Sequence, residues 1–330
     1  MDQNTLLKVE DLKTCFFTDG GIVASVDGVS FSVNRGETVA IVGESGCGKS
    51  VTSLSIMGLL GSSGKIVNGS IRFEGNDLLK LSKKEMRTIR GNNIAMIFQE
   101  PLTSLNPVFT VGYQIRETIL IHEKISKDAA KQRVIELLKQ VGIPHSERIY
   151  HSFPHSLSGG MRQRVMIAMA IACRPKLIIA DEPTTALDVT IQAQILEILK
   201  SLKELNDTTI LLITHDLGVV AEVADRVMVM YAGQLVEQSD VFSLFSAPKH
   251  PYTLGLLNST PKIHRLSEQL ESIEGSVPNP LQMPVGCRFH PRCPSAMDLC
   301  RQSSPPAISM SEREEVKCWL YAETKEAASG

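Results

Sequence analysis

"ETVAIVGESGCGKSVTSLSIMGLL", residues 37–60, reads as a strand, a glycine-rich loop and a helix in immediate succession. Its first part, TVAIV, is apolar and β-branched, which is typical of a buried strand. The loop GESGCGKS (43–50) fits the pattern G-x-x-x-x-G-K-[ST], and it has the strand before it and the helix after it that this pattern requires. Backbone N–H groups of such a loop surround a phosphate, and the helix start adds favourable partial charge. The stretch therefore predicts an α/β fold with a phosphate site.

Within this loop the residue types suit a nucleotide with magnesium. Lys49 can reach the β- and γ-phosphates, and the hydroxyl of Ser50 can ligate Mg²⁺. Cys47 is small, and its N–H group can still bind phosphate. The alternative is a glycine-rich turn that matches by chance, and the flanking strand and helix oppose it. The residues expected to bind the nucleotide are Gly43, Glu44, Ser45, Gly46, Cys47, Gly48, Lys49, Ser50 and Val51.

Three further runs have the length and composition of buried strands: IAMIFQ (94–99), LIIAD (177–181) and TTILLITH (208–215). Helical patterns separate them, among them TIQAQILEILKSLKEL (190–205). Near-continuous apolar strands that alternate with helices predict a parallel sheet covered on both faces. The stretch 111–143 has no strand signal, so we expect an inserted helical subdomain over about residues 102–172.

The chain of 330 residues is longer than one typical domain. After about residue 247 prolines and glycines become frequent and periodicity is lost. We therefore expect a main domain over residues 1–260 and a loop-rich extension over residues 261–330.

Charge and hydropathy exclude several classes of protein. The formal net charge of −2, without a basic run, argues against bulk electrostatic binding of nucleic acid. No apolar run approaches the roughly 18 residues that span a bilayer, and the first residues lack the pattern of a secretory signal. We therefore expect a cytosolic protein, for which other chains supply any membrane-spanning part.

Acidic residues follow one of the predicted strands, in LIIADE (177–182). Asp181 stands at the carboxyl end of that strand, where α/β folds bind ligands, and is expected to hold Mg²⁺. Glu182 follows and can act as general base for an attacking water. Gln99 and His215 end two other strands, where they can sense Mg²⁺ and the γ-phosphate respectively. Each of these two residues, taken alone, reads better as an ordinary polar residue at a strand end.

Two glycines open an apolar helix in LSGGMRQR (157–164). Glycine in a helix interior costs about 1 kcal/mol relative to alanine, so the pair indicates that something approaches the backbone closely. One interpretation is an anion at the helix N-terminus; the other is close packing of a neighbouring helix.

The ordered set GESGCGKS, Gln99, LSGGMRQR, LIIADE, ALD (186–188) and His215 resembles the ATP-binding subunit of an ABC transporter, over about residues 5–250. The resemblance implies that two such domains close over two ATP molecules. It implies catalytic roles for Lys49, Gln99, Glu182 and His215, and a magnesium site at Ser50, Gln99 and Asp181. Residues Ser158, Gly159, Gly160 and Asp188 are then expected at the ATP of the partner subunit. Adenine is expected to stack on an aromatic residue, for which we favour Phe16 over Phe17.

Three other segments resemble the dipeptide and oligopeptide import branch, whose relatives include nickel importers: EPLTSLNPVFTVGYQI (100–115), HPYTLGLLNSTPKI (250–263) and GCRFHPRCPSAMDLC (286–300). The resemblance implies an ATPase that energises peptide import at the cytoplasmic face of the membrane. It implies as partners a second, homologous ATPase subunit in a heterodimer, two membrane permease subunits and an extracytoplasmic solute-binding protein. The alternatives are a nickel or other small-solute importer, and a soluble ABC ATPase that acts on DNA or ribosomes.

Four of the seven cysteines lie in the loop-rich extension: Cys287, Cys293, Cys300 and Cys318. Four thiols in a cytosolic protein favour a metal over disulfides. Their spacing matches neither zinc ribbons nor ferredoxins, so it leaves iron–sulfur, zinc, unligated thiols and disulfides open. The resemblance implies a [4Fe–4S] cluster on these four residues. His290 is a possible substitute ligand, although it reads better as a basic loop residue. Cys15, Cys47 and Cys173 are expected to be packing residues.

Overall fold

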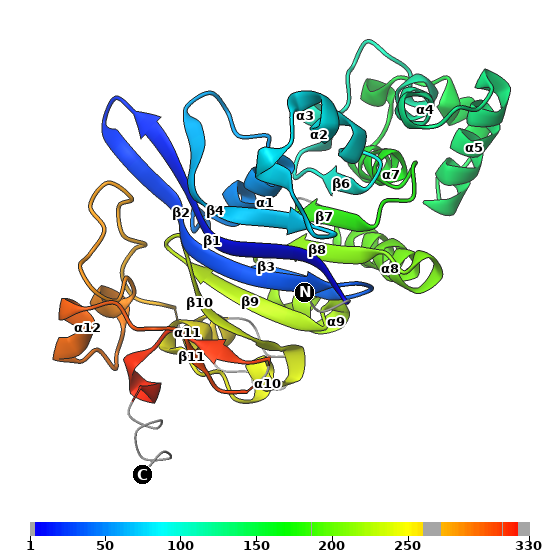
Figure 1. Cartoon of the computed structure of the whole chain (residues 1–330). Helices are drawn as coiled ribbons and strands as arrows, with labels where there is room; N and C mark the ends of the chain where they lie inside the picture. The colour runs from blue at the N-terminus through cyan, green and yellow to red at the C-terminus, as the bar shows by residue number, and fades with distance from the viewer. Residues whose placement is uncertain (1–3, 186, 260–271, 312, 323–330) are drawn as a thin grey trace.

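The computed structural model describes residues 4–185, 187–259, 272–311 and 313–322. Strands in these residues form two sheets (Figure 1). An antiparallel sheet has the order β2-β1-β4-β5, and a larger, central sheet has the order β11-β12-β10-β9-β3-β8-β7-β6. The strands are β1 (Thr5–Thr18), β2 (Gly21–Asn34), β3 (Thr38–Val42), β4 (Gly64–Phe73), β5 (Asn76–Asp77), β6 (Ile94–Ile97), β7 (Leu177–Asp181), β8 (Thr209–Ile213), β9 (Arg226–Tyr231), β10 (Gln234–Asp240), β11 (Ile308–Ser309) and β12 (Glu315–Val316).

Helices connect most of these strands, and several of them are capped as their sequences predict. Ser82 and Glu85, for example, form a capping box at the start of α2. The helices are α1 (Lys49–Met57), α2 (Lys83–Ile89), α3 (Pro101–Ser104), α4 (Val111–His122), α5 (Lys127–Gln140), α6 (Ser146–Tyr150), α7 (Gly159–Ala170), α8 (Val189–Asn206), α9 (Leu217–Val223), α10 (Val241–Ser246), α11 (Pro251–Asn258) and α12 (Asp298–Gln302), with short 3₁₀ turns η1 (Leu78–Lys80), η2 (Pro154–Ser156), η3 (His290–Arg292) and η4 (Trp319–Tyr321).

The middle of the central sheet is parallel, as the apolar strands predict. Strand β3 pairs in parallel with β8 and β9, and β7 pairs in parallel with β8 and β6. Successive side chains of a strand point to opposite faces, and here both faces are buried: Val39 and Ile41 belong to one hydrophobic cluster, and Ala40 and Val42 to another. This explains why these strands are apolar throughout.

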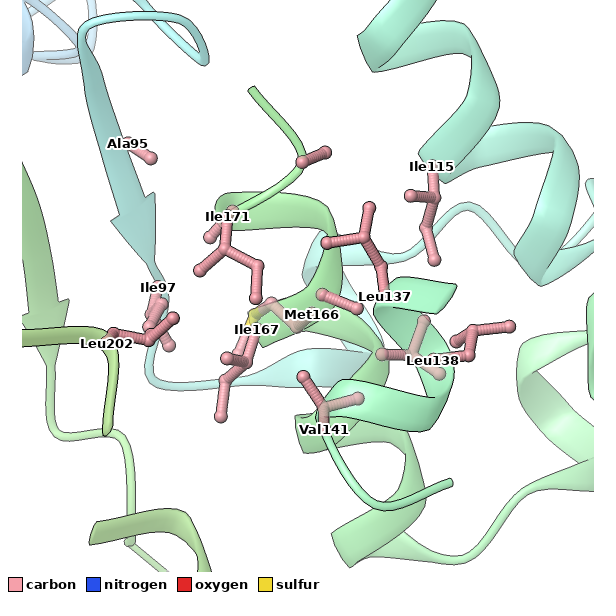
Figure 2. Close-up of a cluster of buried hydrophobic side chains, with 14 of the residues drawn as sticks. Ala95, Ile97, Ile115, Leu137, Leu138, Val141, Met166, Ile167, Ile171 and Leu202 are labelled. Carbon is pink, nitrogen blue, oxygen red and sulfur yellow. The ribbon is translucent and has the colours of Figure 1, made fainter. Parts of the chain in front are cut away.

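Helices α3 to α7 lie in the chain between the adjacent strands β6 and β7. Apolar residues of α4 to α8 pack on one face of the sheet in a shared core (Figure 2). Figure 2 shows Met166 and Ile167 of α7, and Ile171 directly after that helix, between Ile97 of β6 and Leu138 of α5. The start of α7, with its two glycines, is therefore held by a continuous core that joins the helices to the sheet.

The antiparallel sheet of β1, β2 and β4 packs with α1 on the central sheet, and Ile56 of α1 belongs to this second core. In Figure 1 the helices α4 and α5 and the C-terminal segment with α12 lie at opposite ends of the molecule. The loop before α1 lies at the carboxyl end of β3, between these ends.

The C-terminal segment is built onto the central sheet. Strand β12 pairs with β10, and Phe289, which is 2% exposed, packs in a third core with Tyr231 of β9 and Tyr252 of α11. The domain boundary predicted at residues 260 and 261 lies outside the described residues. Among the described residues, no helix combines the length and the apolar character needed to cross a bilayer.

Candidate functional site

The loop 43–50 joins β3 to α1, as predicted, and surrounds the ammonium group of Lys49. That group donates hydrogen bonds to the carbonyl oxygens of Gly43 at 2.8 Å and Glu44 at 3.0 Å. The first backbone bond of the helix runs from Thr52 N–H to Gly48 O, so the N–H groups of residues 49–51 precede it. Such groups at a helix start bind anions. Ser45 and Gly46 are exposed at the tip of the loop, whereas Cys47 is buried.

Two glycines of the loop are required by its geometry. Gly43 has φ 150° and Gly48 has φ 108°, a region that L side chains rarely adopt. A Cβ atom at Gly43 would lie 2.1 Å from the carbonyl oxygen of Met230, and one at Gly48 would lie 2.3 Å from that of Ser25. Strands β9 and β2 thus hold the loop from outside, and only glycine fits between them.

Ser50 and Asp181, both predicted as magnesium ligands, lie together. The hydroxyl of Ser50 donates to Asp181 Oδ1 at 3.0 Å. Asp181 ends β7 and is only 5% exposed, and this burial raises the pKa of its carboxyl group. A hydroxyl and a carboxylate are the hard oxygen donors that Mg²⁺ prefers. A divalent cation at this place would supply the counter-charge that a buried carboxylate needs, so these residues fit the ion.

Glu182 brings Gln99 and His215 together. Its Oε2 atom accepts from Gln99 Nε2 at 3.0 Å, and its Oε1 atom lies 3.3 Å from His215 Nδ1. The backbone of Glu182 has φ 47°, a strained conformation for a residue with a side chain. The ends of β6, β7 and β8 thus place an amide, a carboxylate and an imidazole side by side, beside the loop residues that hold Asp181.

Two residues that the sequence analysis did not single out support this group. Thr185 donates its hydroxyl to Glu182 Oε2 at 2.8 Å. Gln163 of α7, which is 2% exposed, donates its amide to Pro183 O at 2.7 Å. In the sequence Gln163 stands between Arg162 and Arg164, ahead of the apolar run of α7, so no local signal marked it as a buried residue.

The helix α7 begins as the sequence predicts, with Ser158 as its N-cap. The Ser158 hydroxyl accepts from the N–H group of Met161 at 3.3 Å. The two following glycines differ. A Cβ atom at Gly160 would lie 2.9 Å from Ile191 Cγ2 of α8, so close helix packing explains Gly160. At Gly159 a Cβ atom would have no described atom within 4 Å. Packing within the described chain therefore does not require glycine at position 159.

The remaining predicted site residues lie at the surface or near it. Asp188 is exposed, and its carboxylate caps α8 by accepting from Ile191 N–H at 2.9 Å. Ala186 of the same motif lies outside the described residues. Phe16 of β1 is half-buried beside Gly64, and Phe17 is 44% exposed under the ammonium group of Lys65. Val51 lies in the first turn of α1.

All seven cysteines are free. In the described part of the chain no three His, Cys, Asp or Glu side chains are grouped so that they could hold a metal ion. The sequence-based prediction of a metal site is thus not confirmed. The four thiols of the extension are nevertheless close enough to interact electrostatically: burial, with a smaller contribution from Cys287, Cys293 and Cys300, raises the pKa of Cys318 to about 11. Cys287 also interacts with Cys293 and Cys300, and Cys293 with Cys300.

Two family models match the chain. The model described as "ABC transporter" matches residues 26–185, which include the loop 43–50, the start of α7 and Glu182. The model described as "Oligopeptide/dipeptide transporter, C-terminal region" matches residues 236–300, which include α11 and three of the four cysteines of the extension.

Curated relatives match over nearly the full chain. The oligopeptide transport ATP-binding protein AppD of Bacillus subtilis is 57% identical over 97% of this chain and 98% of its own length. The dipeptide transport ATP-binding protein DppD of the same organism is 52% identical over 98% of this chain and 97% of its own length. DppD of Escherichia coli is 51% identical over 95% of this chain and 96% of its own length.

Solved structures share the fold of the main part of the chain. The dimeric ATP-binding cassette MJ0796, in a post-hydrolysis state bound to ADP and Pi, has a TM-score of 0.65 and 28% identity, and the match covers 72% of this chain and 99% of that one. The cbiO1 protein of Clostridium perfringens, part of the transporter complex cbiONQ, has a TM-score of 0.63 and 30% identity, with 74% and 92% covered.

Proposed function

This chain belongs to the ABC transporter family, in its oligopeptide and dipeptide branch, and from that premise we propose that it hydrolyses ATP to energise the import of dipeptides or oligopeptides. The observation that carries the proposal is the set of contacts round Glu182. A carboxylate suited to activate water stands among an amide, a hydroxyl and an imidazole, next to a phosphate loop. This is the arrangement that nucleotide hydrolysis needs.

In the proposed mechanism the loop 43–50 and the first turn of α1 hold the phosphates, and Phe16 stacks on adenine. Lys49 leaves the two loop carbonyls that it now contacts and pairs with the β- and γ-phosphates. Ser50, Asp181 and Gln99 would hold Mg²⁺, which neutralises phosphate charge when it is bound. Glu182 orients and deprotonates the attacking water, and His215 donates to the γ-phosphate.

We further propose that two such cassettes close over two ATP molecules. Ser158, Gly159 and Asp188 would then contact the nucleotide of the partner. All three residues lie at the surface of this chain, and the N–H groups at the start of α7 suit an anion. The solved cassette MJ0796 is a dimer, which supports this arrangement. We propose a homologous second ATPase as the partner, as in a heterodimer.

An exposed apolar surface on the helical region supports contact with membrane permease subunits. Val108 is 70% exposed, Phe109 is 42% exposed and stacks on Tyr113, and Phe153 is 40% exposed. The N–H group of Val111 donates to Ser152 O, so these aromatic residues come from adjacent segments. Single exposed apolar residues are common, whereas a group of them marks an interaction surface. We propose that the helical region of about residues 102–172 contacts the membrane permease subunits through this surface, which places the chain at the cytoplasmic face of the membrane. We also propose an extracytoplasmic solute-binding protein as a further component of the transporter.

Uptake measurements test the proposed function. In a cell that lacks the chromosomal gene, the wild-type chain should restore uptake of a labelled dipeptide or pentapeptide, and a Glu182→Gln chain should not. The peptide length that is restored identifies the class of substrate. Restoration of radioactive nickel uptake alone would instead assign the chain to the nickel importers. If the wild-type chain restores none of the three solutes, the proposal fails.

We also propose that Cys287, Cys293, Cys300 and Cys318 hold a [4Fe–4S] cluster that stabilises the extension. Thiolates are the ligands of such clusters. Each of the four thiols interacts electrostatically with the other three, although no three of them are grouped for a single ion. A [4Fe–4S] cluster binds thiolates that are farther apart than the ligands of one ion, which is why we propose a cluster in place of a single ion. When bound, the cluster would cross-link a segment that has little regular structure.

The variant Cys293→Ser tests this cluster. We expect anaerobically purified wild-type protein to contain iron and sulfide, and the variant to lose both, to melt at a lower temperature and to keep its ATP binding. Cys173→Ser, at a buried thiol in the helical region, is the matched control and should keep its iron. If the wild-type protein contains zinc and no iron, the proposed cluster is wrong and the cysteines hold zinc. Equal metal content and equal melting in Cys293→Ser and the wild type would remove Cys293 as a ligand.

A further inference from the structure

Two residues from the C-terminal part of the chain, Tyr252 and Arg292, contact Glu44 of the phosphate loop. The phenol oxygen of Tyr252 accepts a hydrogen bond from the backbone N–H group of Glu44 at 2.9 Å. The guanidinium group of Arg292 pairs with both carboxylate oxygens of Glu44, at 2.7 and 3.0 Å. One peptide unit of the loop is therefore held at its backbone and at its side chain by residues that follow it by 208 and 248 positions.

Tyr252 is held rigidly in this position. It is fully buried, in the first turn of α11. The carboxylate of Glu237 accepts from the N–H groups of Lys249 and His250 at 2.7 and 2.8 Å, and the His250 ring caps the helix by accepting from Tyr252 N–H. Burial lowers the pKa of His250 to about 3, so its ring is neutral and can accept this hydrogen bond at physiological pH. The segment 250–252 is thus fixed by its own hydrogen bonds, and through Tyr252 it contacts the phosphate loop.

Arg292 is held as firmly, in the turn η3. Its side chain is only 5% exposed, its Nε atom donates to Glu274 O at 2.9 Å, and its guanidinium group lies over the ring of Tyr231 at 5.8 Å. A bidentate pair of this kind has a fixed geometry and loses little entropy, in contrast to surface ion pairs between flexible side chains. The pair therefore sets where the Glu44 side chain can lie.

Glu44 also contacts Lys49, the lysine proposed to bind the phosphates. Its carbonyl oxygen accepts from the ammonium group of Lys49 at 3.0 Å. Glu44 also carries a negative charge beside a site for phosphate, and a charge that is not paired would repel the nucleotide. Arg292 both fixes the peptide that aims Lys49 and neutralises that charge.

We infer that Arg292 and Tyr252 are positioning residues for ATP: they hold the Glu44 peptide of the phosphate loop so that Lys49 is ready to receive the β- and γ-phosphates. This inference rests on the proposed role of Lys49. It assigns the C-terminal segment a part in nucleotide binding, in addition to any structural role of its cysteines.

The chain offers a matched control in Arg288. This residue belongs to the same segment and also ties it to the core, through an ion pair with Asp27 of β2 and a hydrogen bond to Ala232 O. Among the described residues Arg288 forms no hydrogen bond or ion pair with the loop 43–50, unlike Arg292. A loss of ATP binding in Arg292→Ala but not in Arg288→Ala therefore separates positioning of the loop from general docking of the segment.

The experiment measures the dissociation constant of a fluorescent ATP analogue with Mg²⁺ for the purified full-length chain. We expect Arg292→Ala to weaken binding about tenfold, Arg292→Lys to be intermediate and Tyr252→Phe to be weakened less. Glu44→Gln combined with Arg292→Ala should bind more tightly than Arg292→Ala alone, because the unpaired charge is gone. Circular dichroism and thermal melting establish that each variant is folded.

The variant Lys49→Ala distinguishes a failure of this inference from a failure of the proposed nucleotide site. If Lys49→Ala abolishes binding and Arg292→Ala binds ATP like the wild type, the inference is wrong and the proposed site stands. If Lys49→Ala itself binds normally, the proposed nucleotide site is wrong. Equal weakening in Arg288→Ala and Arg292→Ala would also overturn the inference, since a merely structural role predicts that result. If Arg292→Ala does not fold, the comparison of Arg292→Lys and Tyr252→Phe with Arg288→Ala decides in the same way.

Discussion

Replacing Glu182 by glutamine should lower ATP turnover by roughly 10²- to 10⁴-fold, the usual contribution of a general base, and leave ATP binding intact. Glutamine keeps the shape of the side chain and can still contact Gln99 and Thr185, whose partner atoms lie 3.0 and 2.8 Å from Glu182. It cannot accept a proton from water. The closed, ATP-bound dimer should then accumulate, because hydrolysis is what reopens it.

Steady-state ATPase assays, nucleotide binding and size-exclusion chromatography with ATP measure the three parts of this result. The control is Glu222→Gln, which removes an exposed carboxylate on α9 that pairs with Lys200. Its turnover should equal that of the wild type. A Glu182→Gln enzyme with near-normal turnover would exclude Glu182 as the base and direct attention to His215, its neighbour at 3.3 Å.

Gly159→Asp should abolish ATP-dependent dimerisation and lower ATPase activity at least 10²-fold, the typical effect of losing one transition-state donor, while the chain folds and binds ATP normally. A side chain at this position meets no described atom of its own chain within 4 Å. The carboxylate would instead occupy the place proposed for the partner's γ-phosphate and repel it.

Gly160→Asp is the internal comparison, since a Cβ atom there lies 2.9 Å from Ile191. We expect this variant to lower the melting temperature because α7 and α8 must move apart. Thermal melting, ATP binding by the isolated chain and light scattering with ATP distinguish the two variants. If Gly159→Asp dimerises and hydrolyses ATP normally, the proposed contact with the partner's nucleotide is wrong.

Much of the site could be predicted because its residues are tied to strand ends. Apolar runs located β3, β6, β7 and β8, and parallel strands bring their carboxyl ends to one edge. Gln99, Glu182 and His215 each end or follow such a strand, and the structure indeed places them in contact. The roles of these side chains in catalysis stay predictions until the variants are assayed.

Other parts of the fold had weaker local signals. The antiparallel sheet of β1, β2 and β4 contains β-bulges and mixed exposure, so its strands lack a clean alternation of polar and apolar residues. Strands β11 and β12 have two residues each and exist only because β10 offers an edge. Their pairing depends on a neighbour that is distant in sequence.

The glycine-rich loop between β3 and α1, the parallel core and the positions of the acidic and polar residues at strand ends could all be predicted from the sequence. Each of these follows from spacing within a single strand, loop or helix. The contacts that hold the loop in place could be found only from the folded chain. Tyr252 and Arg292 lie 208 and 248 residues beyond Glu44, and no periodicity connects them. Hydrogen bonds between residues so far apart in the sequence depend on how the whole chain packs. A buried polar group needs a partner, and the tertiary fold determines which element lies beside it.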